Sequence, residues 1–358
     1  VYPPFGSIFM TMLLDIPSIL RQKGNRIMKQ LKEQWKKHEF QKCYLFYGAE
    51  TYLIKHYAEV LQKEILPSGT ETMNFDVLEE KKATAATIMD AGETLPFFHD
   101  KRLLVIRNSD FFRKNGRKEE GEKLLDFIKN IPETTCILFI EEKVEKTGKL
   151  YKAIAKIGQV VEFAPLKENG MVAWLKKMCK SGGVVLSHQA AYHLLQVTDN
   201  HMENLEQEIK KLIAYKEGKG EIQIQDIDAV CSVSLEARVF DLVRAMGEKN
   251  VKKAVGFYRD LLTLKESPYM VLSLIARQFR MLLTSALLLQ QGDTQPEIAE
   301  KMGVRDFAVR EYLKQSKHFT KEILEKALQD CLDTDMQIKS GNMAEDLAVE
   351  LLLIQYSK

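Results

Sequence analysis

The sequence predicts a mixed fold, in which an α/β part built on a parallel sheet is followed by an all-helical part. Between residues 28 and 166, short apolar runs rich in Val, Ile, Leu and Phe alternate with stretches of helical period. Such uninterrupted apolar runs are typical of strands covered by helices on both faces of a parallel sheet. From Met171 onward almost every segment has helical period, and no convincing strand is present.

The elements of the α/β part follow one another in a regular order. An amphipathic helix begins near Met28 and leads into the first apolar run, CYLFY. We expect five strands, at 43–47, 74–79, 102–107, 136–141 and 159–164. We expect helices between them, at about 51–65, 83–93, 118–130 and 147–156.

Changes of pattern predict two domain boundaries, near 166 and near 234. The first follows the change at APLKENG, and the second precedes a long helical stretch that opens with SVSLEARVFDL. We therefore expect three domains: an α/β domain at 28–166, a small helical lid domain at 167–234 and a helical collar domain at 235–358.

One collar helix shows the amphipathic pattern clearly. In LIARQFRMLL, helical spacing places four residues along one face, and two arginines lie elsewhere on the surface. The residues of the face are Leu274, Gln278, Met281 and Leu282, and the arginines are Arg277 and Arg280.

Residues 1–27 do not fit the pattern of the rest. Their apolar run SIFMTMLL ends at Asp15, well short of the ~20 residues that a membrane span needs. The amphipathic helix starts at Met28, and the codons of Lys23-Gly24 can spell a ribosome-binding site. We expect residues 1–27 to be a non-native or disordered extension, untranslated in the cell, and we expect no association with a membrane.

The overall composition argues against several kinds of site. The formal net charge of +2 gives no global attraction to nucleic acid or membrane, so any such contact must be local. The five cysteines are isolated, which favours reduced core thiols in a cytoplasmic protein. His188 and His193 are close in sequence but lack a nearby third ligand, so no metal site is expected.

The stretch YLFYGAETYL, residues 44–53, has the strand–glycine–helix form of a nucleotide-binding loop. A phosphate-binding loop needs a second glycine, a Lys and a hydroxyl in fixed register. Here Gly48 is followed by Ala49, Glu50 and Thr51, Lys55 comes too late, and a carboxylate stands where phosphate needs positive charge. The predicted loop is therefore degenerate and non-functional.

AAA+ ATPases also consist of an α/β layer followed by a small helical domain. In an active ATPase of this kind, an apolar strand ends in an acidic pair that binds magnesium. The candidate strand RLLVIRNSD ends in Arg107 and Asn108, and Asp110 lies past its end. CILFIEE ends in two carboxylates, which we interpret as solvated acids at a strand end. The sequence thus predicts no ATP hydrolysis by this chain, and an active ATPase is disfavoured by the missing Lys.

An apolar cluster, Leu95, Pro96, Phe97 and Phe98, stands between a helix and a strand in TLPFFHDKRL. Two adjacent Phe residues cannot both face one core from a regular element, so at least one is expected to be exposed. Two interpretations remain open on pattern alone. The cluster is either a buried staple that closes the turn or an exposed interface hot spot with a charged rim.

Residues 296–319, PEIAEKMGVRDFAVREYLKQSKHF, imitate a helix-turn-helix with Gly303 in the turn. A recognition helix would present Arg305, Arg310 and Lys314 to the major groove. The alternative function from this motif is a DNA-binding regulator with an α/β sensing domain. That alternative requires 296–319 to bind duplex DNA alone, with affinity that falls steeply with salt.

The order and spacing of several segments resemble a known family over 28–358. These segments are YLFYGAETYLI, TLPFFHDKRLLVIRN, ENLEQEIKKLIAY, VFDLVRAMGEKNVKKAVGFYRDLL, LIARQFRMLL and DTDMQIKSGNMAEDLAVELLLI. Together they resemble the delta subunits of bacterial DNA polymerase III clamp loaders.

The resemblance implies an AAA+ fold that has lost ATP binding, with no catalytic site and no cofactor in this chain. It implies a subunit of a cytoplasmic DNA-directed DNA polymerase holoenzyme, a nucleotidyltransferase, that binds and opens the ring-shaped beta sliding clamp. The family's exposed Leu/Phe element matches 95–98 here. The implied partners are the beta clamp, the tau/gamma ATPase subunits, delta prime, and primer–template DNA through the complex.

Overall fold

The computed structural model describes residues 31, 33–35, 37–66, 71–198 and 201–358. The chain divides into two compact units between Leu166 and Lys167, which we call the sheet unit and the helical unit and describe separately. The expectation that residues 1–27 are a non-native or disordered extension concerns residues outside the described ranges.

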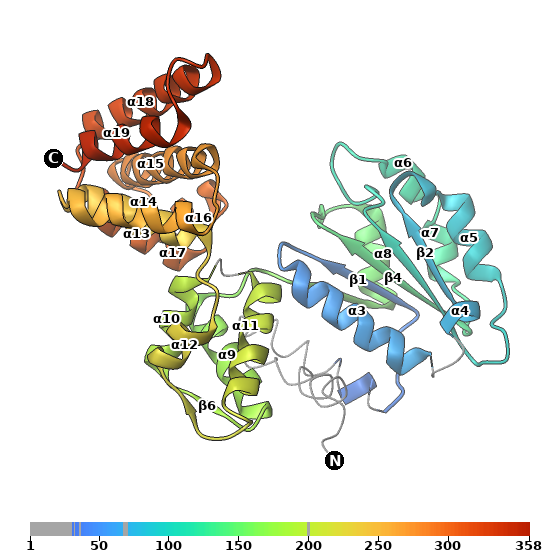
Figure 1. The fold of residues 1–358 in the computed structure, drawn as a ribbon. Helices are drawn as coiled ribbons and strands as arrows, with labels where there is room; N and C mark the ends of the chain where they lie inside the picture. The colour runs from blue at the N-terminus through green and yellow to red at the C-terminus, as the bar shows by residue number, and fades with distance from the viewer. Residues whose placement is uncertain (1–30, 32, 36, 67–70, 199–200) are drawn as a thin grey trace. The chain divides into compact units, whose positions relative to one another are not determined.

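The sheet unit is built on five parallel strands in the order β2-β3-β4-β1-β5 (Figure 1). The strands are β1 (Cys43–Tyr47), β2 (Phe75–Glu79), β3 (Arg102–Arg107), β4 (Thr135–Glu141) and β5 (Gln159–Glu162). All five predicted strands are present, with ends that differ by at most two residues. Because β1 lies between β4 and β5, the loop that follows β1 emerges between the ends of those two strands.

Helices connect the strands, largely where the helical period predicts them. They are α3 (Thr51–Ile65), α4 (Glu71–Asn74), α5 (Ala85–Glu93), α6 (Lys118–Glu122), α7 (Leu125–Lys129) and α8 (Lys149–Ile157), with a 3-10 turn at Glu80–Lys82. The single helix expected at 118–130 is wrong, because two short helices occupy this segment. Asn74, expected in a strand, instead ends α4.

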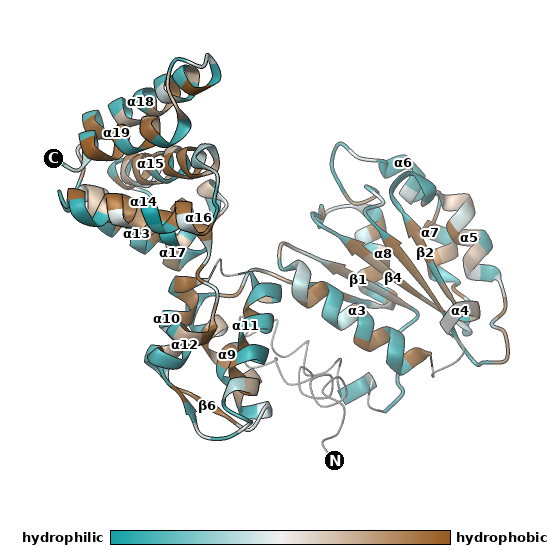
Figure 2. Cartoon of the chain, viewed as in Figure 1, coloured by the Kyte–Doolittle hydropathy of each residue, from teal (hydrophilic) through white to brown (hydrophobic). Residues whose placement is uncertain are grey.

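Both faces of the sheet are buried, which explains the uninterrupted apolar runs. In Figure 2 the strands are predominantly brown, the colour of hydrophobic residues. Alternate β1 residues Cys43 and Leu45 pack in a core with α5, α7 and α8. On the other face, Tyr57 of α3 has its ring centroid 5.6 Å from that of Phe163, and Phe163 packs on Phe46.

The first part of the helical unit, which we call the lid segment, contains four helices. They are α9 (Glu168–Ser181), α10 (His188–Val197), α11 (Met202–Tyr215) and α12 (Ile224–Val230). The expectation of no strand after Met171 is wrong, because β6 (Val185–Leu186) and β7 (Glu221–Ile222) form a small parallel sheet. Strands of two residues are too short to produce an alternating pattern.

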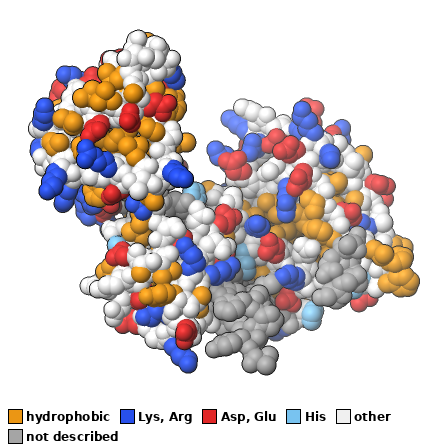
Figure 3. Space-filling model, viewed as in Figure 1, with side chains coloured by type: hydrophobic (Ala, Val, Ile, Leu, Met, Phe, Trp, Pro, Cys, Tyr) orange, Lys and Arg blue, Asp and Glu red, His pale blue; other side chains and the backbone are white. Residues whose placement is uncertain are grey.

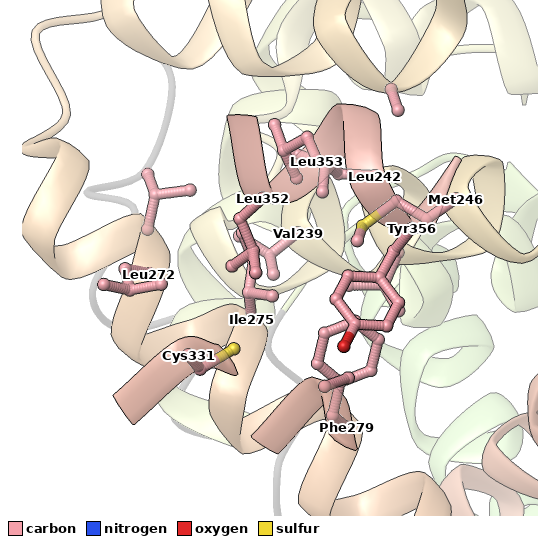
Figure 4. Packing of buried hydrophobic residues seen from close by; sticks show 14 of the residues in the cluster. Val239, Leu242, Met246, Leu272, Ile275, Phe279, Cys331, Leu352, Leu353 and Tyr356 are labelled. Carbon is pink, nitrogen blue, oxygen red and sulfur yellow. The ribbon is translucent and has the colours of Figure 1, made fainter. Parts of the chain in front are cut away.

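The remainder, which we call the collar segment, is all-helical in its described residues. Its helices are α13 (Leu235–Gly247), α14 (Val251–Thr263), α15 (Pro268–Gln290), α16 (Gln295–Met302), α17 (Asp306–Ser316), α18 (Lys321–Lys339) and α19 (Glu345–Tyr356). Figure 4 shows how α13, α15, α18 and α19 meet in one apolar core, with the rings of Phe279 and Tyr356 facing each other. Their centroids are 5.8 Å apart.

Helix α15 is the central element of this core. Ile275 and Phe279 are fully buried, whereas Leu274 and Met281 of the predicted face are only half-buried. The predicted face was therefore partly wrong, because α15 is contacted by α13, α17, α18 and α19 and buries a broad side. By length and composition α15 could cross a membrane, but its buried apolar residues, such as Val271, Ile275 and Phe279, pack in the collar core.

Candidate functional site

The loop between α5 and β3 carries three exposed large apolar side chains close together in sequence. Leu95, Phe97 and Phe98 are 77%, 51% and 90% exposed, and Pro96 is half-buried. Figure 3 shows hydrophobic side chains gathered at the edge of the sheet unit where this loop lies in Figure 1. The buried-staple interpretation is therefore wrong, and we call residues 95–98 the wedge.

The base of the wedge is fixed where the loop leaves α5 and where it enters β3. Arg102 begins β3, and its Nη1 donates to the carbonyl oxygen of Thr94 at 3.0 Å. The same guanidinium forms an ion pair with Asp76 of β2, and the Arg102 side chain is only 6% exposed. A buried arginine thus joins the two ends of the loop.

The middle of the wedge is held by a residue that the sequence did not suggest. Asn74 is fully buried, and its side-chain amide forms two hydrogen bonds with the backbone of Phe97. Asn74 Nδ2 donates to the Phe97 oxygen at 2.9 Å, and the Phe97 nitrogen donates to Asn74 Oδ1 at 2.7 Å. The next residue, Phe98, has a left-handed backbone with φ of 48°.

The loop after β1 keeps the turn of a phosphate-binding loop, but its backbone donors are used internally. Gly48 nitrogen donates to the Glu141 oxygen at 3.3 Å, and Glu50 nitrogen donates to the Phe163 oxygen at 3.1 Å. The Glu50 side chain is buried at the start of α3, and Thr51 is exposed. These contacts favour the prediction that the loop at Gly48, Glu50 and Thr51 does not bind phosphate.

Packing accounts for the glycine at position 48. Its φ is 130°, and a Cβ there would lie 2.3 Å from the carbonyl oxygen of Phe163. No residue with a side chain fits this geometry without a shift of the backbone. The glycine is therefore required by the close approach of β1 to the chain beyond β5, independently of any nucleotide.

The ends of β3 and β4 carry the acidic groups that the sequence offered as candidates for magnesium binding. Arg107 ends β3 and pairs with Glu79 at 3.3 Å, and Asp110 lies in the loop beyond, as expected. Glu141 is 1% exposed, so its interpretation as a solvated acid is wrong, although Glu142 is exposed. Burial raises the pKa of Glu141 to about 7, while hydrogen bonds from Ser109 oppose this shift.

The possible metal-ligating residues lie apart in the described ranges. Within the described ranges, no three His, Cys, Asp or Glu residues are grouped in a way that could bind an ion. His193 instead contacts Asp228, with 2.6 Å between Nε2 and Oδ1. The five cysteines are buried and unpaired, in agreement with the expected core thiols.

The helix-turn-helix lookalike is formed by α16 and α17, with Gly303 in a left-handed turn between them. Its two arginines contact the lid segment. Arg310 pairs with Glu168 at 2.8 Å, and Arg305 Nη1 lies 3.4 Å from the sulfur of Met171. Lys314 pairs with Glu311 on its own helix. The basic groups that would read DNA are engaged within the helical unit.

Two family models match the chain, one in each unit. Residues 44–164 match the family described as DNA polymerase III, delta subunit, and residues 236–356 match the DNA polymerase III delta subunit, C-terminal domain. The chain belongs to the DNA polymerase III delta subunit family.

Two curated proteins are similar in sequence to most of the chain. The chain is 28% identical over 330 residues to DNA polymerase III subunit delta of Bacillus subtilis (strain 168), covering 90% of this chain and 95% of that protein. It is 24% identical over 273 residues to the probable DNA polymerase III subunit delta of Aquifex aeolicus (strain VF5), covering 74% and 77%.

A solved structure agrees with the fold as well. The Bacillus subtilis DNA clamp loader delta protein matches with a TM-score of 0.77 and 25% identity, covering 92% of this chain and 99% of that one. The family and the fold class expected from the sequence are confirmed. The comparisons give no support to a helix-turn-helix regulator.

Proposed function

We propose that this chain, a delta-type component of a DNA polymerase III clamp loader, binds the beta sliding clamp through the wedge and opens the ring. The observation that carries the proposal is the wedge itself. Its side chains Leu95, Phe97 and Phe98 are exposed to solvent, and hydrogen bonds with a neighbouring side chain hold its backbone at Phe97. Exposed aromatic and aliphatic anchors on a fixed loop are typical of interface hot spots.

The energetics fit a docking element. Burying a Leu or Phe side chain that was exposed releases about 1.5–3 kcal/mol. Three such residues in one loop together release about 4.5–9 kcal/mol. This offsets a large part of the cost of association, which is about 4–15 kcal/mol, and the contacts around the wedge supply the rest. A wedge that binds the open clamp more tightly than the closed clamp shifts the equilibrium toward the open form. The size of the shift is set by the difference between the two affinities.

The motor function belongs to partners in this proposal. The sheet unit is a degenerate AAA+ domain, because the loop at Gly48 lacks the Lys and hydroxyl that phosphate needs. ATP binding to the tau/gamma subunits exposes the wedge, and ATP hydrolysis after DNA entry withdraws it. The collar segment packs against those subunits and delta prime, and primer–template DNA is met through the assembled, cytoplasmic replisome.

The decisive experiment measures affinity for the cognate clamp by surface plasmon resonance with the full chain. Replacement of Leu95, Phe97 and Phe98 by Ala removes at least two anchors at about 2 kcal/mol each, so Kd should rise by about 1,000-fold. The thermal midpoint should change little, because these side chains are exposed.

A matched control replaces three exposed apolar residues of the collar segment. Leu332, Met336 and Leu351 are 53%, 61% and 48% exposed, so their replacement by Ala changes a similar surface elsewhere in the chain. Clamp affinity should stay within about twofold of the wild type. If the wedge variant binds as well as this control, the wedge is not the clamp-binding element.

A further inference from the structure

We infer that Asn74 is the positioning residue of the wedge, which sets the conformation in which Phe97 and Phe98 meet a partner. This inference rests on the proposed function for its binding consequence. Its structural basis is independent of that function, because it lies in the contacts of one buried side chain.

The two hydrogen bonds from Asn74 use both polar groups of the Phe97 backbone. An antiparallel strand makes the same exchange with a residue opposite to it, so one side chain replaces a strand neighbour. The amide of Asn74 is fully buried and has both a donor and an acceptor satisfied by Phe97. Holding both peptide groups that flank Phe97 fixes the direction in which the chain continues.

The conformation fixed in this way is an unfavourable one. Phe98 has φ of 48°, in the left-handed region that is unfavourable for a residue with an aromatic side chain. The strained residue directly follows the peptide group that Asn74 holds. Its ring stacks edge-on with that of Phe97, with 4.4 Å between centroids and 84° between planes.

The other contacts of the loop fix its ends and leave this role to Asn74. Arg102 holds Thr94 before the wedge. After it, the Lys101 nitrogen donates to His99 Nδ1 at 3.1 Å, and Lys101 Nζ donates to the Glu133 oxygen at 2.9 Å. A loop with fixed ends and a released middle would sample several orientations of its two rings, and only a fraction of them would fit the partner.

Replacement of Asn74 should therefore weaken clamp binding although Asn74 itself is buried. If the competent fraction of the loop falls to about a tenth, the apparent Kd rises about tenfold. Two variants of the full chain serve the test, Asn74→Ala and Asn74→Ser, so that poor folding of one does not remove it. The matched control is Asn130→Ala, because Asn130 also donates from Nδ2 to a backbone oxygen, that of Asp126 at 2.9 Å.

Limited digestion with chymotrypsin gives a second readout that needs no clamp. The enzyme cleaves after Phe, so cleavage mapped by mass spectrometry at Phe97 and Phe98 reports the order of the wedge. Both Asn74 variants should be cleaved there at least several-fold faster than the wild type. The thermal midpoint of each variant that folds should match that of the wild type, which shows that only the wedge is released. Asn130→Ala should match the wild type in cleavage and in Kd.

The outcomes separate this inference from the proposed function. Unchanged clamp affinity of the wedge variant overturns the clamp-binding proposal, and cleavage alone then decides whether Asn74 orders the loop. If the wedge variant loses binding while both Asn74 variants retain wild-type affinity and cleavage rates, the positioning role is overturned. A higher Kd for the clamp together with faster cleavage in the Asn74 variants supports it.

Discussion

The buried carboxyl group of Glu141 should make the stability of the sheet unit depend on pH. Glu141 ends β4 beside the loop that follows β1, and its Oε1 accepts hydrogen bonds from the nitrogen and hydroxyl of Ser109. Its Oε2 is buried and has no hydrogen-bond partner. Removal of this group from water raises its pKa from 4.5 to about 7, and nearby Asp110 adds to the rise.

The sign follows from proton binding in the two states. Between pH 4.5 and 7 the native protein holds a proton on Glu141 that the unfolded chain has released. Stability is therefore lost as pH rises through this window, at about 1.4 kcal/mol per pH unit for one group. The total contribution is about 3 kcal/mol, and above pH 7 it stays lost.

The assay is urea denaturation of the wild type and of Glu141→Gln at several pH values between 4.5 and 8. A Trp174→Phe background leaves Trp35 as the reporter of the sheet unit, where its indole donates to the Tyr44 hydroxyl. The difference in unfolding free energy between the two proteins should grow by about 3 kcal/mol in favour of Gln as pH rises.

A control uses the neighbouring exposed carboxylate. Glu142 pairs with Arg113 at 3.0 Å, and its side chain is 58% exposed. For Glu142→Gln the difference should stay within about 1 kcal/mol across the range, as for other surface ion pairs. A flat profile for Glu141→Gln would refute the reasoning, since it would mean that Glu141 titrates at its ordinary pKa despite its burial.

Two further predictions concern nucleotide and assembly. The purified full chain should bind no ATP by calorimetry at millimolar nucleotide, because the Gly48 and Glu50 nitrogens donate to the carbonyl oxygens of Glu141 and Phe163. A micromolar Kd that is abolished by altering the Gly48 loop would contradict this. A fragment that begins at Ser234 should fold and join the tau/gamma subunits, because α13–α19 enclose a core of their own; a fragment that stays unfolded, or folds without associating, would place the interface elsewhere.

The sequence predicts most of the sheet unit because its strands are buried on both faces. CYLFY and RLLVIR are uninterrupted apolar runs, and both are strands within the predicted bounds. The wedge was also accessible to sequence reasoning, since two adjacent Phe residues after Pro96 cannot both enter one core. The prediction that at least one is exposed is confirmed, and both are.

What the sequence could not predict depends on contacts between distant segments. Asn74 lies 23 residues before its partner Phe97, and nothing in its neighbours distinguishes it from a residue that opens a strand. Glu141 and Glu142 are identical letters side by side, yet one is buried and one exposed. Glu141 is the last residue of β4 and is buried with the sheet, whereas Glu142 lies past the end of the strand. The local sequence does not mark where that end falls.

The carboxyl ends and the amino ends of the strands carry different features in this protein. Ligands of open parallel sheets are usually received at the carboxyl ends of the strands, where Gly48 and Glu141 lie. The wedge stands at the amino ends, just before β3, and Asn74 stands just before β2. The length of the strands separates their amino ends from their carboxyl ends. Substitutions at one end therefore need not disturb the other. In the function proposed above, the partner is bound at the amino ends of the strands rather than at their carboxyl ends.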